Sequence, residues 1–361
     1  GNIVGSAERF KEDLLVVDLN LDNVIAKRLK DPRSRKTKII DNLQKVEFID
    51  IDYQTKGQRR PIDKKHVNKL SQEEEIYNAL ITGTRDYVSK NGFKKVCIGL
   101  SGGIDSALVT VIAVEALGRD NVDCLFMPSV YTSKESRDDV YLLAKKLDIN
   151  ITEIPITNIF DSYINALSNH FRDKPQDITE ENLQSRIRGN LLMAWSNKFG
   201  HLVLTTGNKS EMAVGYATLY GDMAGGFAVI KDICKTTVYL ICRWLNDKHG
   251  YDLIPESIIA KPPTAELRYN QKDTDTLPPY DTLDSIIETY IEHDIDIEGL
   301  LSVFKDKNEL QRILRMIDKS EYKRRQAPIG IKVTKRAFGR DRRYPVTNRY
   351  DIFNPLNCKD I

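Results

Sequence analysis

Apolar and polar residues alternate with two different periods along the middle of the chain. Between Ser71 and Asn91, apolar residues recur at helical spacing after a serine that can cap a helix, and acidic residues fill the first turn. Residues 95–100 form a short apolar run that ends in Ser-Gly-Gly. The next apolar helical stretch ends at Gly118, where a glycine C-cap is typical. The pattern predicts a helix, a strand, a glycine turn and a second helix.

The same alternation continues beyond Gly118. Short apolar runs predict strands over residues 122–127, 151–156 and 201–206. Amphipathic stretches predict helices over residues 133–147, 181–200 and 235–250, and a further helix that begins near residue 158. Nearly continuous apolar strands separated by helices are typical of a parallel sheet that is covered on both faces. We therefore predict an α/β fold, a three-layer doubly wound parallel sheet with its ligand site at the carboxyl ends of the strands. Residues 251–290 contain two Pro-Pro pairs and are predicted to be loop-rich, and the last forty or so residues are predicted to be basic and irregular.

The composition indicates the class of protein but no particular binding partner. The chain has 361 residues, of which 41% are hydrophobic and 29% charged, with 54 basic against 52 acidic residues and a net charge of +2. These values are typical of a globular protein and do not suggest a nucleic-acid partner. No apolar run approaches the roughly 20 residues of a membrane span, and the first residues lack a signal-peptide pattern, so we expect a cytoplasmic protein without a membrane partner. The five cysteines form no Cys-x-x-Cys pair and are expected to be reduced.

The clearest chemical motif lies between the first predicted strand and the following helix. It consists of two glycines, two hydroxyls, one apolar residue and one carboxylate: Ser101, Gly102, Gly103, Ile104, Asp105 and Ser106. Glycines let the backbone approach a ligand, and the amides of a helix N-terminus bind a phosphate. The carboxylate of Asp105 would repel a phosphate unless a divalent cation lay between them, so the motif indicates Mg²⁺ with a pyrophosphate group. The alternative is a glycine turn in which Asp105 only caps the helix; a Walker A P-loop is excluded because its sequence is missing.

This motif resembles the pyrophosphate loop of the N-type ATP pyrophosphatases, the adenine nucleotide alpha-hydrolase-like family, whose members cleave ATP between its α- and β-phosphates. Three further segments, 181–190, 204–222 and 261–267, together resemble the NAD synthetase domain. The resemblance extends from about residue 60 to about residue 350.

The resemblance implies a role for individual residues. It places Ser101 to Ser106 and Thr206 against ATP, with Lys235 and Thr264 as further ATP contacts. It places Asn182, Arg186 and Glu211 at the site of deamido-NAD or of the metal, and Lys323 over the substrate. Asp105 and Lys235 are then the candidate catalytic residues, and Asp105 and Glu211 are the candidate ligands of Mg²⁺.

Each of these residues also has a purely structural interpretation. Glu211 follows Asn208 by three positions and could complete a capping box. Arg186 and Arg188 lie on a predicted helix, where arginines are usually solvated. Lys235 opens its helix, where a cation is unfavourable against the helix dipole unless an anion accompanies it.

The implied activity is that of an NAD synthetase, a carbon-nitrogen ligase. ATP adenylates the nicotinate carboxylate of deamido-NAD, and ammonia then displaces AMP to give NAD, with pyrophosphate as the other product. The resemblance also implies a homo-oligomer, a dimer or a multiple of dimers. The alternatives are another ligase of the same group, such as a GMP synthetase, a nucleotide-binding sensor without turnover, and an RNA-binding role for the basic residues 336–343.

Three regions are expected along the chain. Residues 1–60 are interpreted as a remnant of a nitrilase-like glutaminase domain plus a linker, in which residues 11–25 resemble its terminal strand. Residues 61–350 are the predicted ATP-pyrophosphatase domain, and residues 351–361 are a tail. None of the five cysteines lies in a context suited to a glutaminase nucleophile. The chain is thus expected to be a fragment that depends on free ammonia, whereas its parent protein takes ammonia from glutamine.

Overall fold

The computed structural model describes residues 3–31, 49, 62, 65, 67–172, 174–347 and 353. The chain divides into two compact units, Gly1–Leu70 and Ser71–Ile361. In the first unit, residues 12–20 have no regular structure and α1 (Leu21–Lys30) follows, with the side chain of Asn20 accepting a hydrogen bond from the Asp22 amide. The expected strand over 11–25 is therefore wrong. The apolar residues Leu21, Val24, Ile25 and Leu29 recur at helical spacing, which explains the helix.

The second unit is built on one parallel sheet. Its strands are β1 (Val96–Gly99), β2 (Val122–Phe126), β3 (Ile151–Glu153), β4 (Leu202–Thr205) and β5 (Phe227–Ala228), in the order β3-β2-β1-β4-β5. Val96 pairs with Val122 on one side and with Leu202 on the other. The chain order reverses between β1 and β4, so the topological switch point lies where β1 runs into the motif at residues 101–106.

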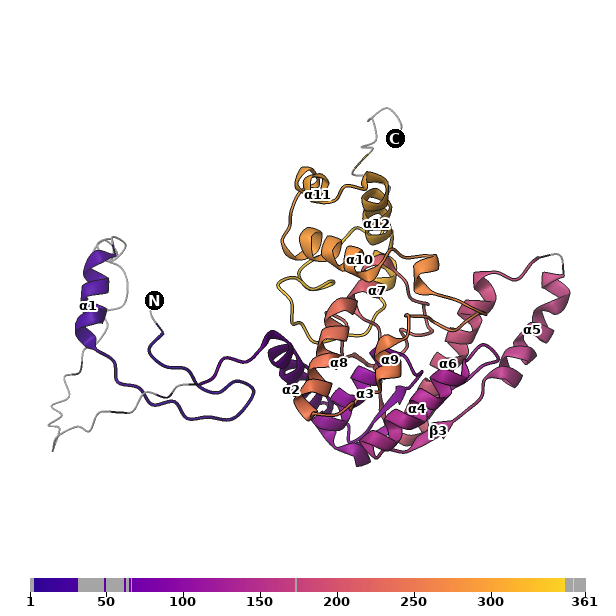
Figure 1. The fold of residues 1–361 in the computed structure, drawn as a ribbon, viewed down its shortest axis with the longest axis horizontal. Helices are drawn as coiled ribbons and strands as arrows, with labels where there is room; N and C mark the ends of the chain where they lie inside the picture. The colour runs from indigo at the N-terminus through magenta and orange to yellow at the C-terminus, as the bar shows by residue number, and fades with distance from the viewer. Residues whose placement is uncertain are drawn as a thin grey trace. The chain divides into compact units, whose positions relative to one another are not determined.

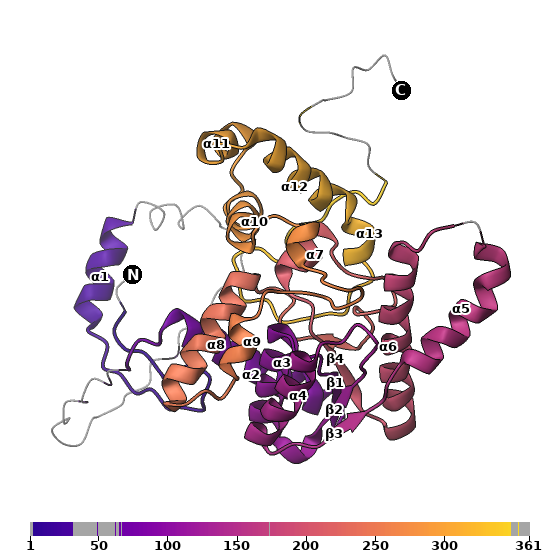
Figure 2. The same cartoon turned by 45° about the vertical axis from the view of Figure 1, so that its right-hand side comes forward.

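Helices cover both faces of this sheet, as Figures 1 and 2 show. In Figure 2, α2, α3, α4 and α8 lie on one side of the labelled strands, and α6 lies on the other with α5 beyond it. This arrangement confirms the predicted doubly wound α/β fold. The helices are α2 (Gln72–Lys90), α3 (Ile104–Leu117), α4 (Lys134–Leu147), α5 (Thr157–Phe171), α6 (Ile178–Phe199), α7 (Lys209–Val214), α8 (Lys235–His249), α9 (Glu256–Ala260), α10 (Tyr280–Ile287), α11 (Ile297–Val303), α12 (Lys307–Lys319) and α13 (Glu321–Arg324), with the short turns η2 (Arg119–Asn121), η3 (Asp273–Asp275) and the π-helical η4 (Glu288–Glu292).

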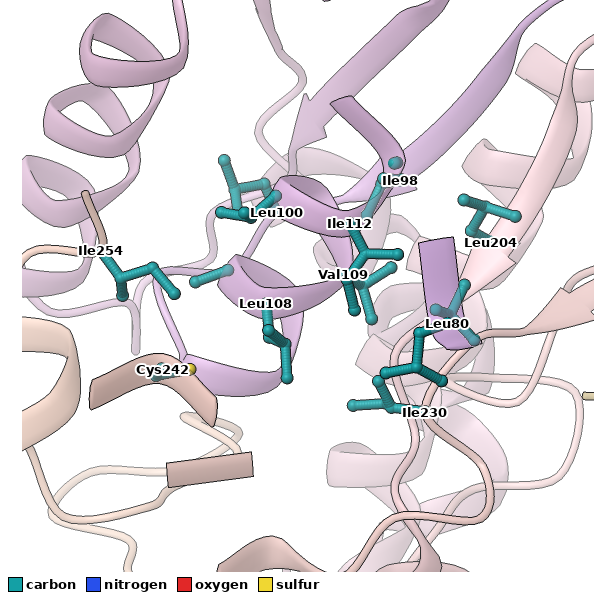
Figure 3. Packing of buried hydrophobic residues seen from close by; sticks show 14 of the residues in the cluster. Leu80, Ile98, Leu100, Leu108, Val109, Ile112, Leu204, Ile230, Cys242 and Ile254 are labelled. Carbon is teal, nitrogen blue, oxygen red and sulfur yellow. The ribbon is translucent and has the colours of Figure 1, made fainter. Parts of the chain in front are cut away.

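Successive residues of each central strand enter different cores. Val96 and Ile98 of β1 belong to the core under α2, α3 and α8, whereas Cys97 between them belongs to the core under α5 and α6. The same alternation holds for Leu202, Val203 and Leu204 of β4. Figure 3 shows the first of these cores, where Leu80, Ile112 and Leu204 converge from α2, α3 and β4. Both faces of the sheet are thus apolar, which explains why the strands appear as continuous hydrophobic runs.

A third apolar cluster lies among α7, α10, η4, α11 and α12. The prediction of a loop-rich stretch over 251–290 is confirmed for residues 261–272, which form no helix or strand, whereas α9 and α10 form on either side of them. Pro255 and Pro279 occupy the N-cap positions of these helices. Proline is tolerated at the start of a helix because its missing N–H would have no partner there. In α12, Leu310, Ile313, Leu314 and Ile317 are all buried on one face.

Several local predictions are confirmed at the residue level. Ser71 caps α2 by accepting a hydrogen bond from the Glu74 amide, and Gly118 and Gly250 end α3 and α8 with positive φ. The irregular end of the chain is confirmed in part, since residues 325–347 form no helix or extended strand, whereas α13 precedes them. The expected tail at 351–361 lies outside the described residues, except for Phe353. Across the ranges that the structure describes, no helix is both long and apolar enough to cross a bilayer.

Candidate functional site

A cavity of about 620 Å³ opens at the carboxyl ends of β1, β2 and β4, where the switch point predicts a ligand site. Most of the residues proposed from the sequence line its wall: Ser101, Gly103, Ile104, Asp105, Ser106, Asn182, Thr206, Glu211, Lys235, Thr264 and Lys323. Gly102 and Arg186 do not. The structure therefore brings together residues from six segments that are far apart in the sequence.

The loop at residues 101–106 is shaped by its own hydroxyls. Ser106 Oγ accepts from the Ser101 amide at 3.2 Å and donates to the Gly103 carbonyl at 2.9 Å. Ser101 Oγ accepts from the Gly103 amide at 3.3 Å and lies 3.1 Å from Ser106 Oγ. Gly103 is the N-cap of α3, and no side chain caps that helix by a hydrogen bond. The two hydroxyls thus shape the loop, and the helix N-terminus is left to bind an anion.

Asp105 is held by two partners from other elements. Its Oδ1 accepts from Asn208 Nδ2 at 3.0 Å, and its Oδ2 forms an ion pair with Lys235 Nζ. These contacts are not those of a capping residue, because the N-cap position belongs to Gly103. The purely structural interpretation of Asp105 as a helix cap is therefore wrong.

Lys235 is the buried cation of the cavity, with only 3% of its side chain exposed. Its Nζ lies 3.6 Å from Glu211 Oε1, in addition to the pair with Asp105. Burial alone would lower the pKa of Lys235, but the charges of Asp105 and Glu211 outweigh it, and the net pKa is raised. Lys235 is therefore a permanent positive charge between two carboxylates.

A buried carboxylate explains how a lysine can open α8. Asp284 Oδ2 accepts from the Thr236 amide at 2.8 Å, and Asp284 Oδ1 accepts from Ser210 Oγ. Ser210 Oγ in turn accepts from the Lys235 amide at 2.9 Å. The negative charge of Asp284 at the start of the helix offsets the dipole penalty that Lys235 would otherwise carry.

Glu211 completes the capping box that its position allowed, and it also lines the cavity. Its Oε2 accepts from the Asn208 amide at 3.2 Å while Asn208 Oδ1 accepts from the Glu211 amide at 2.9 Å, which completes the capping box of α7. Its other oxygen faces Lys235 in the cavity. Burial and the neighbouring Asp105 raise the pKa of Glu211 to about 8. Burial and the charge of Asp105 thus disfavour ionisation of Glu211, and a further cation beside it would favour ionisation.

A further cation such as Mg²⁺ fits this site, because it would let Asp105 and Glu211 both ionise beside Lys235. Magnesium in proteins is commonly held by one or two carboxylates together with substrate phosphates and water, rather than by a cage of protein ligands. Asp105 and Glu211 supply two carboxyl groups beside the loop at residues 101–106. Within the described ranges no group of three or more His, Cys, Asp or Glu side chains could hold a metal by itself. The residues present therefore fit a metal that arrives with a phosphorylated substrate.

Asp273 is a further carboxylate of the cavity wall that sequence reasoning missed. Its two oxygens accept from Tyr280 Oη at 2.8 Å and from Tyr216 Oη at 3.2 Å, and burial raises its pKa. Tyr280 also packs its ring 5.3 Å from Lys235 Nζ. No local motif marks Asp273, because its partners come from other parts of the chain.

On α6 the structure distinguishes between two neighbouring arginines. Arg186 is exposed and its Nε donates to the Leu219 carbonyl at 3.2 Å, outside the cavity wall. Arg188 lines the cavity, its Nε donates to the Met127 carbonyl at 3.0 Å, and burial lowers its pKa to about 10. At neutral pH its guanidinium is a half-buried cation. The lining residues of α6 recur every three or four positions and include Arg188 but not Arg186: Ile178, Glu181, Asn182, Ser185, Arg188, Gly189 and Leu192.

Asn182 and Lys323 line the side of the cavity next to α7. Asn182 Oδ1 accepts from Thr218 Oγ1 at 2.8 Å. Lys323 Nζ donates to the carbonyls of Gly215 and Ala217, each at 2.7 Å, and burial lowers the pKa of this lysine. Both side chains thus fix the segment that follows α7.

The NAD synthase family model matches residues 76–327 of this chain. The chain belongs to the NAD synthase family. The glutamine-dependent NAD(+) synthetase of Thermotoga maritima is 54% identical over 351 residues, which cover 97% of this chain and 60% of that protein. This chain therefore spans about three-fifths of the length of that relative.

Solved structures agree with this family assignment. The glutamine-dependent NAD+ synthetase of Acinetobacter baumannii, in complex with ADP, is 45% identical with a TM-score of 0.54, and the match covers 79% of this chain and 51% of that one. The NH3-dependent NAD synthetase of Campylobacter jejuni, in complex with a nitrate ion, is 27% identical with a TM-score of 0.56, covering 70% of this chain and 96% of that one. The fold is thus that of the adenine nucleotide alpha-hydrolase-like proteins, as the sequence motifs predict.

Proposed function

We propose that this chain catalyses the ATP-dependent amidation of deamido-NAD by ammonia, with NAD, AMP and pyrophosphate as products. The observation that carries the proposal is the cavity at the switch point. There a phosphate-binding loop, the Asp105–Lys235 pair and Glu211 face one another in a chain of the NAD synthase family. The Acinetobacter baumannii relative was solved in complex with ADP, which supports an adenine nucleotide as a ligand.

In the first step the nicotinate carboxylate must acquire a better leaving group. Its oxygen attacks the α-phosphorus of ATP, the bond from that phosphorus to the bridging oxygen breaks, and pyrophosphate leaves with the electron pair. The amides at the start of α3 and the cation of Lys235 stabilise the negative charge that develops on the phosphates. When bound, Mg²⁺ would neutralise charge on the leaving pyrophosphate, and Asp105 and Glu211 would hold it.

In the second step ammonia attacks the carbonyl carbon of the acyl-adenylate. The carbon–oxygen bond to the phosphate breaks, AMP leaves, and the nitrogen loses a proton to give the amide. No protein nucleophile is required, so positioning and charge stabilisation account for the acceleration. We assign ATP contacts to residues 101–106, Thr206, Lys235 and Thr264, and deamido-NAD contacts to Asn182, Glu211 and Lys323.

The cysteines support free ammonia as the nitrogen donor of this polypeptide. A glutaminase thiol must ionise to act as a nucleophile. Burial raises the pKa of Cys97 and of Cys124 to about 12, and it raises the pKa of Cys234 and Cys242 further. Cys358 lies outside the described residues. None of the four described thiols is activated for glutamine hydrolysis.

A direct assay tests this function. The chain, ATP, Mg²⁺ and deamido-NAD should give NAD and AMP in equal amounts when ammonium is added, and glutamine should not replace ammonium. Xanthosine monophosphate, the acceptor of a GMP synthetase, should not stimulate ATP cleavage. Glutamine-driven turnover by the pure chain would show an unrecognised catalytic thiol. Stimulation of ATP cleavage by xanthosine monophosphate would show that deamido-NAD is not the substrate.

The two arginines of α6 form a matched pair for a second test. We expect Arg188→Met to raise the KM for one of the two anionic substrates about 10- to 100-fold, because a buried charge-assisted contact contributes roughly 1.5–3 kcal/mol. Arg186→Met should change either KM less than about threefold, because an exposed arginine contributes little. A larger rise in KM for Arg186→Met than for Arg188→Met would show that Arg186, and not Arg188, contacts a substrate.

We further propose a homo-oligomer, a dimer or a multiple of dimers, and a cytoplasmic location. The assembly follows from the family resemblance rather than from any contact between chains. Sedimentation at assay concentrations tests it, and a strictly monomeric species with full activity would contradict it.

A further inference from the structure

Lys261 lies in the cavity wall beside the phosphate-binding loop and contacts the loop directly. Its Nζ donates to the Gly102 carbonyl at 2.9 Å and to Ser136 Oγ at 2.9 Å, and it forms an ion pair with Asp139 Oδ2 at 3.1 Å. A lysine ammonium has three N–H groups, and these three acceptors use all of them. All three N–H groups of Lys261 therefore bind protein atoms, and none is left for a substrate phosphate.

Gly102, whose carbonyl accepts the hydrogen bond from Lys261, packs closely against the start of α4. Gly102 has a φ of +83°, and a Cβ on it would come within 2.5 Å of the Ser136 carbonyl oxygen. Both the backbone conformation and the space therefore require glycine here. Because the peptide group is planar, holding the Gly102 carbonyl also fixes the direction of the Gly103 N–H, which donates to Ser101 Oγ.

The other end of the segment that begins at Lys261 is attached to the same helix. Glu266 Oε1 accepts from Ser133 Oγ at 2.8 Å and from Ser136 Oγ at 2.6 Å, and Ser133 is the N-cap of α4. Thr264 lies between these two attachments and lines the cavity. The start of α4 thus carries both the phosphate-binding loop and the segment with Thr264.

We propose that Lys261 is a positioning residue for the nucleoside triphosphate. It holds the Gly102 carbonyl away from the cavity and locks segment 261–266 to α4, so that the loop amides and Thr264 are prearranged for the same ligand. This inference rests on the proposed function, because it takes the loop as the site of the ATP phosphates. Loss of the ammonium leaves the loop free to sample other peptide orientations, and the cost appears as weaker triphosphate binding.

Three variants test the proposal: Lys261→Met, Lys261→Arg and the control Lys90→Met, whose lysine is exposed and pairs with Asp86 within α2. Calorimetry with Mg²⁺ and the non-hydrolysable α,β-methylene analogue of ATP should show a Kd raised about 10- to 100-fold in Lys261→Met, the size expected for a lost charge-assisted hydrogen bond. Lys261→Arg should recover most of the affinity, and the Kd for deamido-NAD should change less than about threefold. An unchanged Kd for the analogue in Lys261→Met would overturn the proposal.

A double variant separates positioning from simple charge balance. Asp139 is 4% exposed, so Lys261→Met alone leaves a nearly uncompensated buried carboxylate and lowers the thermal midpoint. Lys261→Met with Asp139→Asn removes both charges and should recover the midpoint while binding of the analogue stays weak. Recovery of both the midpoint and the affinity would show that Lys261 only balances Asp139, and it would overturn the proposal.

Hydrogen exchange gives a readout that needs no nucleotide. In the free protein, the amides of residues 102–106 should exchange faster in Lys261→Met than in Lys90→Met. Equal exchange in the two variants would contradict the positioning role even if ATP binds. Failure of the unsubstituted chain to bind the analogue would instead contradict the proposed function, so the two failures are distinguishable.

Discussion

Lys235→Met should lower turnover by about three orders of magnitude or more, the loss typical when a preorganised electrostatic partner is removed from a buried site. Methionine keeps the length of the side chain but leaves Asp105 and Glu211 without their shared cation. The same change should lower the free energy of unfolding by about 3–5 kcal/mol, because it breaks a buried ion pair. Steady-state NAD formation and denaturant unfolding of the same preparation measure both effects.

Lys209 offers a matched control for this experiment. It is fully buried, and its Nζ lies 3.0 Å from Asp232 Oδ1 and 2.8 Å from Glu292 Oε1, but it does not line the cavity. Lys209→Met should therefore destabilise the fold to a similar extent and change turnover less than about tenfold at a temperature where the variant is folded. Equal losses of turnover in the two variants would show that Lys235 acts only through folding.

The sheet and the place of the site could be predicted because both depend on local patterns. Each strand is a continuous apolar run in the sequence because both faces of the sheet are buried. In β1, for example, Cys97 enters one core and its neighbours Val96 and Ile98 enter the other, and all three are buried. The order of strand, glycine turn and helix places residues 101–106 at the carboxyl end of β1. The switch point then follows from the way parallel sheets are connected.

Local signals in the second half of the chain indicate only part of its structure. Pro262 and Pro263 lie in a stretch without helix or strand, as predicted, whereas Pro279 stands at the start of α10, where a missing N–H costs nothing. On α6, the family motif suggests Arg186, which follows Asn182 by four residues, whereas the structure places Arg188 in the cavity wall. Helical spacing from Asn182 therefore does not single out Arg188, and the residue type does not decide either, because both candidates are arginines.

Other features of the site could not be predicted from the sequence, because they depend on contacts between distant segments. Nothing near Lys235 in the sequence reveals that Asp284 caps its helix or that Asp105 pairs with its side chain. Likewise, Asp273 becomes a site residue only through Tyr216 and Tyr280. These contacts are set by the packing of α7, α8 and α10, which single-sequence patterns do not specify.

Asp105→Asn should lower turnover by roughly two to four orders of magnitude, the range for loss of a preorganised charge in a catalytic site. Asparagine keeps the size and one carbonyl oxygen, which can still accept from Asn208 Nδ2. It removes the negative charge that faces Lys235 and that we assign to Mg²⁺ binding. This variant breaks the same buried ion pair as Lys235→Met, but Glu211 still lies 3.6 Å from Lys235 Nζ, so the free energy of unfolding should fall by less, no more than about 3 kcal/mol.

The stability and activity of this variant together discriminate between the two roles. A carboxylate that served the fold alone would give losses of activity and stability in proportion, whereas a metal-binding carboxylate gives a folded protein with little turnover. Raising the Mg²⁺ concentration should recover part of the activity in the second case, since weaker metal binding can be offset by mass action. Asp86→Asn on the exposed face of α2 serves as the control and should be fully active. A well-folded Asp105→Asn with nearly full activity would remove Asp105 from the metal site, and the phosphate charge would then have to be balanced by Lys235 and the α3 amides alone.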